Sequence, residues 1–144
     1  MTTTMIPVFQ NTLTKSDQWL TEITNLLDWN DKSKAWKALR AVLHTLRDRL
    51  TVEESTDLAS QLPMLIRGMY FEGWNPSKKP VRMKKYQEFV DAVTEGFTDI
   101  DFGDNLEPDD IPRAVLKVLS SHVSAGEIKD VIQSLSEELR ALWD

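Results

Sequence analysis

Apolar residues recur at alternating three- and four-residue steps near the centre of the chain. This spacing puts five large side chains on one face of an α-helix: Trp36, Leu39, Leu43, Leu46 and Leu50. Thr51 follows, three residues before Glu54, which is the spacing of a capping box. In a capping box the cap hydroxyl accepts a hydrogen bond from the backbone N–H of the third helical residue. The carboxylate of that third residue accepts a hydrogen bond from the backbone N–H of the cap residue. The pattern predicts a helix, a tight corner and a second helix, which ends or kinks at Pro63 because proline lacks an N–H.

The same arrangement recurs 73 positions later without a gap. A second capping box is formed by Ser124 and Glu127, in register with the first. Further positions match in type: Arg40 with Arg113, Ala41 with Ala114, Val42 with Val115, Leu43 with Leu116, Leu46 with Leu119, Asp57 with Asp130 and Leu62 with Leu135. A capping box that recurs in register indicates an internal duplication rather than chance leucine matches.

The remaining helical patterns extend each copy to three helices. A first helix is expected from Thr14 or Ser16, and Asp31 is expected to cap the central helix. A helix over about residues 83–97 carries Phe89 and Val93, which echo Trp19 and Ile23 of the first helix. The predicted fold is all-α: a compact antiparallel helical bundle built from two internally duplicated three-helix units. Residues 1–13 are expected to form a loose arm and 14–144 a single domain, with repeats over about 14–72 and 83–143.

The run RL-T-x-E-E followed by LASQLP, over residues 49–63, resembles the domain-of-unknown-function family numbered 2267. The resemblance covers nearly the whole chain after the first dozen residues and implies two helical repeats. It implies no catalytic residues. Ser136 stands where the first repeat has Pro63, which leaves the helix that begins at Ser124 free to continue without a kink.

Composition sets further bounds on the function. The absence of cysteine excludes disulfides, thiol catalysis and Cys-ligated metals. No apolar run approaches the ~20 residues of a membrane span, and residues 5–9 are too short for a signal-peptide core, so a cytoplasmic protein without a membrane partner is expected. Residues 1–90 hold 13 Lys/Arg and 10 Asp/Glu, a balance of +3, whereas residues 91–144 hold 4 and 13, a balance of −9. The two halves could attract each other, or they could present surfaces of opposite charge to partners. The third alternative is that the charges form an ordinary solvated surface without a function.

Candidate chemistry is sparse. His44 has Asp48 at i+4, but an ordinary surface contact is favoured over catalysis or metal binding, and His122 is expected at the surface of a helix end. Arg47 and Arg49 suit the carboxyl end of the central helix and less readily form a clamp for an anion. The acidic loop 98–110 fails the EF-hand template, because Gly103 falls at position five, and a solvated loop is favoured over a looser cation site. No catalytic residue, metal ligand or cofactor is assigned.

One segment is a candidate partner surface, because its cations lie between two aromatic residues, Trp74 and Tyr86. It consists of Trp74, Lys78, Lys79, Arg82, Lys84 and Lys85. The sequence argues against nucleic acid as a partner, since the helix after the corner begins with carboxylates, which repel phosphates. The favoured function is a non-enzymatic helical protein-interaction or adaptor domain that binds a protein partner or itself. The alternative is a small-molecule or cofactor-binding protein with the ligand between the two repeats, and nothing in the sequence calls for an enzyme.

Overall fold

The regular structure of the protein is helical throughout the part that the computed structural model describes, residues 5–97 and 105–144. The all-α prediction is therefore confirmed for these residues. The helices are α1 Pro7–Leu27, α2 Lys32–Arg49, α3 Val52–Ala59, α4 Met64–Tyr70, α5 Tyr86–Glu95, α6 Asp110–His122 and α7 Ala125–Ser134, with short 3-10 helices η1 Pro76–Lys78 and η2 Leu139–Trp143. Within the same residues, no helix combines the length and apolar character needed to cross a bilayer.

Helix α1 begins earlier than the sequence patterns predict. The expected loose arm over residues 1–13 is wrong for residues 7–13, which form the first two turns of α1, while residues 1–4 lie outside the described part. Pro7 occupies the first helical turn, where its missing N–H costs nothing and its fixed φ suits the helix. The helix ends at Asp28, which adopts the left-handed conformation with a φ of 55°.

The central stretch folds as its pattern predicts. Asp31 caps α2 by accepting the amide of Ser33 at 2.9 Å. Four leucines of the predicted stripe have no solvent exposure: Leu39, Leu43, Leu46 and Leu50. Thr51 caps α3, with its hydroxyl accepting the amide of Glu54 at 3.1 Å. Pro63 stands immediately before α4, so the chain breaks there as expected.

The second central unit has the same cap but a different continuation. The hydroxyl of Ser124 accepts the amide of Glu127 at 3.3 Å and starts α7. The expectation that this helix runs on without a kink is wrong, because α7 ends at Ser134. Ser136 stands where the first unit has Pro63, and like that proline it marks a break between helices. Its hydroxyl accepts a hydrogen bond from the backbone N–H of Leu139 at 3.3 Å, at the start of η2.

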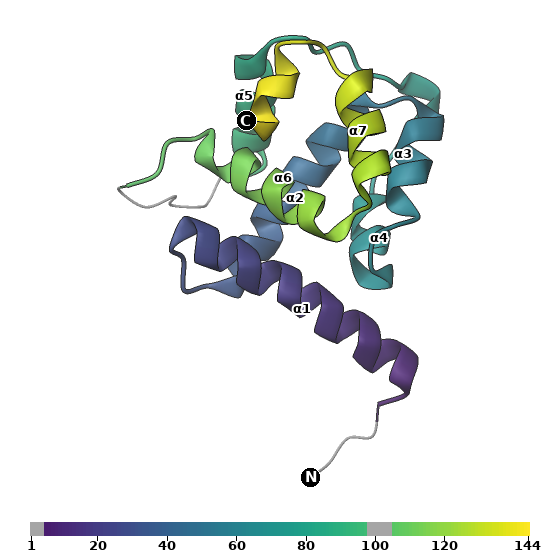
Figure 1. The fold of residues 1–144 in the computed structure, drawn as a ribbon, viewed down its shortest axis with the longest axis vertical. Helices are drawn as coiled ribbons and strands as arrows, with labels where there is room; N and C mark the ends of the chain where they lie inside the picture. The colour runs from purple at the N-terminus through teal and green to yellow at the C-terminus, as the bar shows by residue number, and fades with distance from the viewer. Residues whose placement is uncertain (1–4, 98–104) are drawn as a thin grey trace.

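Helices α2 and α6 lie side by side in the middle of the molecule (Figure 1). Helix α1 packs across both of them, and α3 packs on α7. Helix α5 packs on α2 and reaches only from Tyr86 to Glu95, shorter than the expected 83–97. At its end a Cβ on Gly96 would lie 2.9 Å from the Cβ of Ala41, so the close approach of α5 to α2 depends on a glycine. Leu43 of α2 and Leu116 of α6 are fully enclosed, so both central helices face a shared core.

Candidate functional site

The basic segment after α4 runs beside the end of α2. The amide of Val81 donates to the carbonyl oxygen of Asp48 at 2.7 Å, and the Arg49 guanidinium donates to the carbonyl oxygen of Val81 at 3.3 Å. Lys79 forms an ion pair with the Asp48 carboxylate at 3.1 Å, and its side chain is only 10% exposed. Lys79 therefore holds the segment to α2 and is not presented to a partner.

The other members of the predicted partner surface divide into two groups. Lys78, Arg82, Lys84 and Lys85 are exposed and form none of the ion pairs of the described residues. Trp74 is half-buried against Phe71, with ring centroids 5.2 Å apart, so it does not project as an anchor. The partner surface thus stays a prediction for the four exposed cations.

The two histidines have structural partners. Nε2 of His44 lies 2.7 Å from the carbonyl oxygen of Met69, and burial lowers the pKa of this imidazole. His122 stacks on Trp19, with centroids 4.9 Å apart, and its Nε2 lies 2.5 Å from a carboxylate oxygen of Glu22. Both rings therefore join helices to each other, and His122 is less exposed than the sequence position suggests.

Arg47 is buried, and its side chain reaches carbonyl groups outside its own helix, α2, instead of those at the carboxyl end of that helix. Its guanidinium donates to the carbonyl oxygens of Tyr70 at 2.5 Å and Glu72 at 2.7 Å, while Nε donates to Asp48 at 3.0 Å. The hydroxyl of Ser55 donates to the Arg47 carbonyl at 2.8 Å. These contacts occupy carbonyls that the carboxyl end of α4 leaves unpaired, so Arg47 joins α2, α3 and α4.

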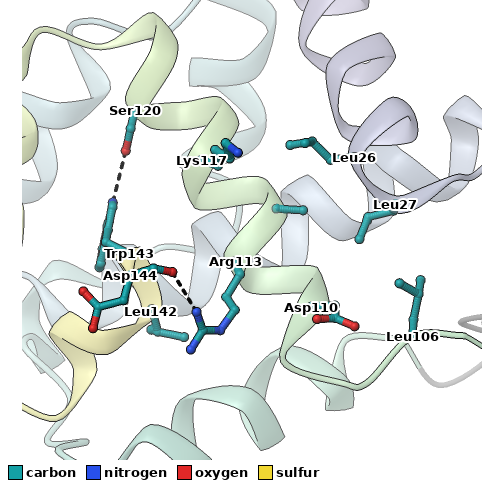
Figure 2. Close-up of a pocket in the computed structure, with 11 residues that line it drawn as sticks. Leu26, Leu27, Leu106, Asp110, Arg113, Lys117, Ser120, Leu142, Trp143 and Asp144 are labelled. Atoms are coloured by element: carbon teal, nitrogen blue, oxygen red, sulfur yellow. Dashed lines mark hydrogen bonds between the residues drawn. The ribbon is translucent and has the colours of Figure 1, made fainter.

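A half-open pocket of about 580 Å³ lies between the carboxyl end of α1, α6 and the last turn η2 (Figure 2). Its apolar lining is Leu26, Leu27, Leu106, Ala114, Leu142 and Trp143, and its polar lining is Asp110, Arg113, Lys117, Ser120 and Asp144. The volume falls in the range of about 300–1,000 Å³ that is usual for small-molecule sites. No sequence motif marks the pocket, because its walls come from residues that are distant in the chain.

The polar groups of the pocket differ in availability. The Arg113 guanidinium donates to the Tyr86 hydroxyl at 2.9 Å and to the Asp144 carbonyl at 2.8 Å, and the Tyr86 hydroxyl donates to Asp109 at 2.8 Å. The hydrogen bond to Tyr86 raises the pKa of Arg113, and burial raises the pKa of Tyr86. Lys117 is exposed and has no carboxylate partner in the described part of the chain, so it is the cation that remains available to a ligand.

The start of α1 carries a surface that the sequence patterns do not reveal. Six large apolar side chains at the first turns of α1 and of α4 are exposed by 41–56%: Ile6, Val8, Phe9, Leu13, Met64 and Leu65. We call these residues the N-terminal apolar surface. The Thr12 hydroxyl accepts the amide of Leu65 at 2.9 Å, which fixes α4 against α1. A shallow groove of about 260 Å³ between the two helices is lined in part by Val8 and Met64.

Three carboxylates meet where α3 packs on α7. Glu54, Glu127 and Asp130 each bring one oxygen to within 4.8 Å of the other two. Oxygen atoms are the ligands that calcium and magnesium prefer, but exposed acidic groups also gather without an ion. The residues of the acidic loop at 98–104 lie outside the described residues, and of its remaining members Asp109 binds Tyr86 while Asp110 accepts the Glu107 amide at 2.9 Å.

The fold and these surfaces define an all-helical protein with an apolar patch at the start of α1 and a half-open pocket at the far end of the same helix. A family model described as an uncharacterized conserved protein, DUF2267, matches residues 16–142. The chain therefore belongs to the DUF2267 family, as the resemblance implies. None of the curated proteins matches this sequence.

Proposed function

We propose that this protein is a non-enzymatic helical protein-interaction domain, and that the N-terminal apolar surface is where it docks. The observation that carries this proposal is the uncovered apolar face of α1. Phe9 is 54% exposed, whereas Trp19 and Ile23, further along the same helix, are 2% and 0% exposed. Figure 1 shows the N-terminal end of α1 extending beyond the other helices. Clustered exposed apolar residues of this kind are typical of interaction sites.

A second copy of this chain is the occupant that the surface fits. Residues 5–14 contain no charged side chain, although charged residues make up 28% of the protein. A two-fold contact places the same surface of two copies face to face, so an uncharged surface pairs with itself without repulsion between like charges. Homodimer interfaces are also more apolar than the interfaces of transient complexes.

Sedimentation equilibrium over a range of protein concentrations tests this proposal. The unmodified protein is expected to sediment as a dimer at high concentration, and Phe9→Ser combined with Leu13→Ser to sediment as a monomer. Val52→Ser is the matched control, because Val52 is 41% exposed but lies on α3, away from the surface. Far-UV circular dichroism checks that each variant is folded.

If the protein is a monomer at every concentration, the proposal that a second copy binds the N-terminal apolar surface is refuted. Equal weakening by the double substitution and by Val52→Ser would also contradict it, because the effect would then not belong to the N-terminal apolar surface. If the exposed cations of residues 78–85 instead bound the acidic half of a second copy, raising the salt concentration would abolish the association. Association through apolar contacts would persist at high salt.

We also infer that the two halves are copies of one helical unit with four elements rather than the three expected from the sequence: α1 to α4 in the first half, and α5, α6, α7 and η2 in the second. Pairs of contacting residues support this inference at the 73-residue offset. The Arg67 guanidinium donates to the Leu62 carbonyl at 2.9 Å, and Arg140 donates to the equivalent Leu135 carbonyl at 3.3 Å. Arg47 contacts Tyr70, and at the equivalent positions the Trp143 indole donates to the Ser120 hydroxyl at 3.1 Å.

A second candidate function is the binding of a small molecule in the pocket of Figure 2, which lies between α1 of the first unit and α6 and η2 of the second. Leucines and Trp143 form an apolar wall there, and Lys117 is available to an anion. An amphipathic molecule with an apolar body and one acidic group would use both features.

Calorimetric titration with decanoate and with decanol as probes tests the second function. Binding of both is expected, with Lys117→Gln weakening decanoate by about two- to fivefold, the effect of one exposed ion pair, and leaving decanol unchanged. Lys129→Gln on α7 is the matched control, since Lys129 is exposed and does not line the pocket. If neither probe binds, and native mass spectrometry of the isolated protein finds no retained ligand, the pocket has no such function.

A further inference from the structure

Two glutamates face each other at the contact between α3 and α7. Glu54 is the third residue of α3 and Glu127 is the third residue of α7, each following its own hydroxyl cap. One oxygen of Glu54, one of Glu127 and one of Asp130 lie within 4.8 Å of one another. The contact is thus built from the same position of the two central units, 73 residues apart.

Both glutamates leave a carboxylate oxygen enclosed without a partner. Oε1 of Glu54 and Oε1 of Glu127 are shielded from solvent and accept no hydrogen bond. In a complete capping box the glutamate would return a bond to the amide of its cap. At α7 the carboxamide of Gln61 takes that place, because its Oε1 accepts the Ser124 amide at 2.8 Å. Glu127 is therefore free to face Glu54.

The surroundings of the pair are acidic. Burial raises the pKa of Glu127 to about 7, and the neighbouring carboxyl of Glu54, followed by the charges of Asp57 and Asp130, acts in the same direction. On α4, burial raises the pKa of the Tyr70 phenol, and the charge of Glu127 acts in the same direction. Neither Glu54 nor Glu127 takes part in an ion pair with any described cation. Two carboxylates so placed favour a state in which one of them is protonated.

We propose that Glu54 and Glu127 share one proton and act as a pH-sensitive clasp between α3 and α7. When the proton is present, one carboxyl group donates a hydrogen bond to the other. The enclosed carboxylate oxygens of Glu54 and Glu127 then have a hydrogen-bond partner. When the proton leaves, two negative charges face each other and the α3–α7 contact weakens. This device is separate from the N-terminal apolar surface and from the pocket, so it stands whether or not either of them binds a partner.

The sign of the pH effect follows from the proton balance. An unfolded glutamate loses its proton near pH 4.5, whereas the Glu127 carboxyl of the folded protein holds its proton to about pH 7. Between these values the folded state binds more protons than the unfolded state, so stability falls as the pH rises. The unfolding midpoint should therefore be lower at about pH 8 than at about pH 5.5.

Urea unfolding of four proteins at these two pH values tests the clasp. The unmodified protein should lose stability at the higher pH, and Glu127→Gln and Glu54→Gln should each lose clearly less. Glu53→Gln is the matched control, because Glu53 precedes Glu54 on α3 but is exposed to solvent. It should behave like the unmodified protein. His44 and His122 are unchanged in all four proteins, so the difference between variants isolates the glutamate pair.

A carbon-13 NMR titration of the glutamate side chains in the unmodified protein gives an independent reading. One carboxyl resonance should change near pH 7, and it should be absent from Glu127→Gln. The clasp is refuted if every glutamate titrates below about pH 5, or if Glu53→Gln and Glu127→Gln change the pH dependence equally. It is also refuted if millimolar calcium at high pH raises the midpoint of the unmodified protein but not of Glu127→Gln. That result would make the cluster a cation site instead.

Discussion

Replacement of Arg47 by methionine should destabilise the protein strongly, although a charged residue at the end of a helix would ordinarily be dispensable. The Arg47 side chain is 6% exposed and donates to the carbonyl oxygens of Tyr70 and Glu72. Methionine keeps much of the apolar stem and removes only the donors. The experiment therefore isolates the hydrogen bonds from the packing.

The magnitude follows from what each partner loses. The Tyr70 carbonyl contact is buried, so losing its donor costs about 1–3 kcal/mol. The Glu72 carbonyl lies nearer the surface and can take a water molecule, which adds about 1 kcal/mol. Asp48 keeps Lys79 as its ion-pair partner at 3.1 Å, so its charge is not orphaned. Burying a guanidinium is itself costly, and this offsets part of the loss. The two losses add to about 2–4 kcal/mol, and this offset lowers the expected net cost to about 1–3 kcal/mol.

Urea unfolding followed by tryptophan fluorescence and circular dichroism measures this loss. With an m-value of about 2 kcal/mol/M, the midpoint should fall by about 0.5–1.5 M without a change in m. Arg40→Met is the matched control, because Arg40 lies on the same helix but is exposed, and it should change stability by less than about 0.5 kcal/mol. If both variants unfold at the same midpoint, the Arg47 contacts do not stabilise the fold and the reasoning is wrong.

Five further substitutions test the capping and packing of the helices by the same unfolding assay. Thr51→Ala and Ser124→Ala each remove a hydroxyl cap and should cost about 0.5–2 kcal/mol, and unchanged midpoints would show that these caps are not needed. Leu46→Ala should cost about 2–5 kcal/mol because Leu46 is fully enclosed, whereas Leu26→Ala, at a site 46% exposed, should cost much less; equal costs would contradict the assignment of the core. Gly96→Ala would place a methyl group 2.9 Å from a side-chain carbon of α2 and should cost about 1–3 kcal/mol, and a neutral result would mean that α5 can shift freely.

The features that could be predicted from sequence are local ones. The leucine stripe of α2 repeats with the helical period, and a buried face needs no information beyond that period. The hydroxyl caps Thr51 and Ser124 act within three residues, so their spacing is enough to find them. The start of α1 was missed because Ile6, its cap residue, makes no side-chain cap bond; Pro7 in the first turn was the signal that could have revealed it.

The features that could not be predicted depend on residues distant in the chain. The sequence places Arg47 at a helix end, but its partners at Tyr70 and Glu72 come from the packing of α4 on α2. The return bonds expected from Glu54 and Glu127 give way to a contact between the two glutamates, because α3 packs on α7. Lys79 was expected to face a partner, but Asp48 lies within reach only after the segment folds back along α2. In each case a non-local contact overrides the local pattern.

The interaction role of the N-terminal apolar surface is the central claim, and hydrogen exchange measured at several protein concentrations tests it most directly. A second copy seated on the surface would shield the first turns of α1, so exchange of the amides of residues 10–14 should slow as the concentration rises. Exchange in α5, which is away from the surface, should not change and serves as the internal reference. Exchange in α1 that is independent of concentration, in a protein with the helices described above, would contradict the account.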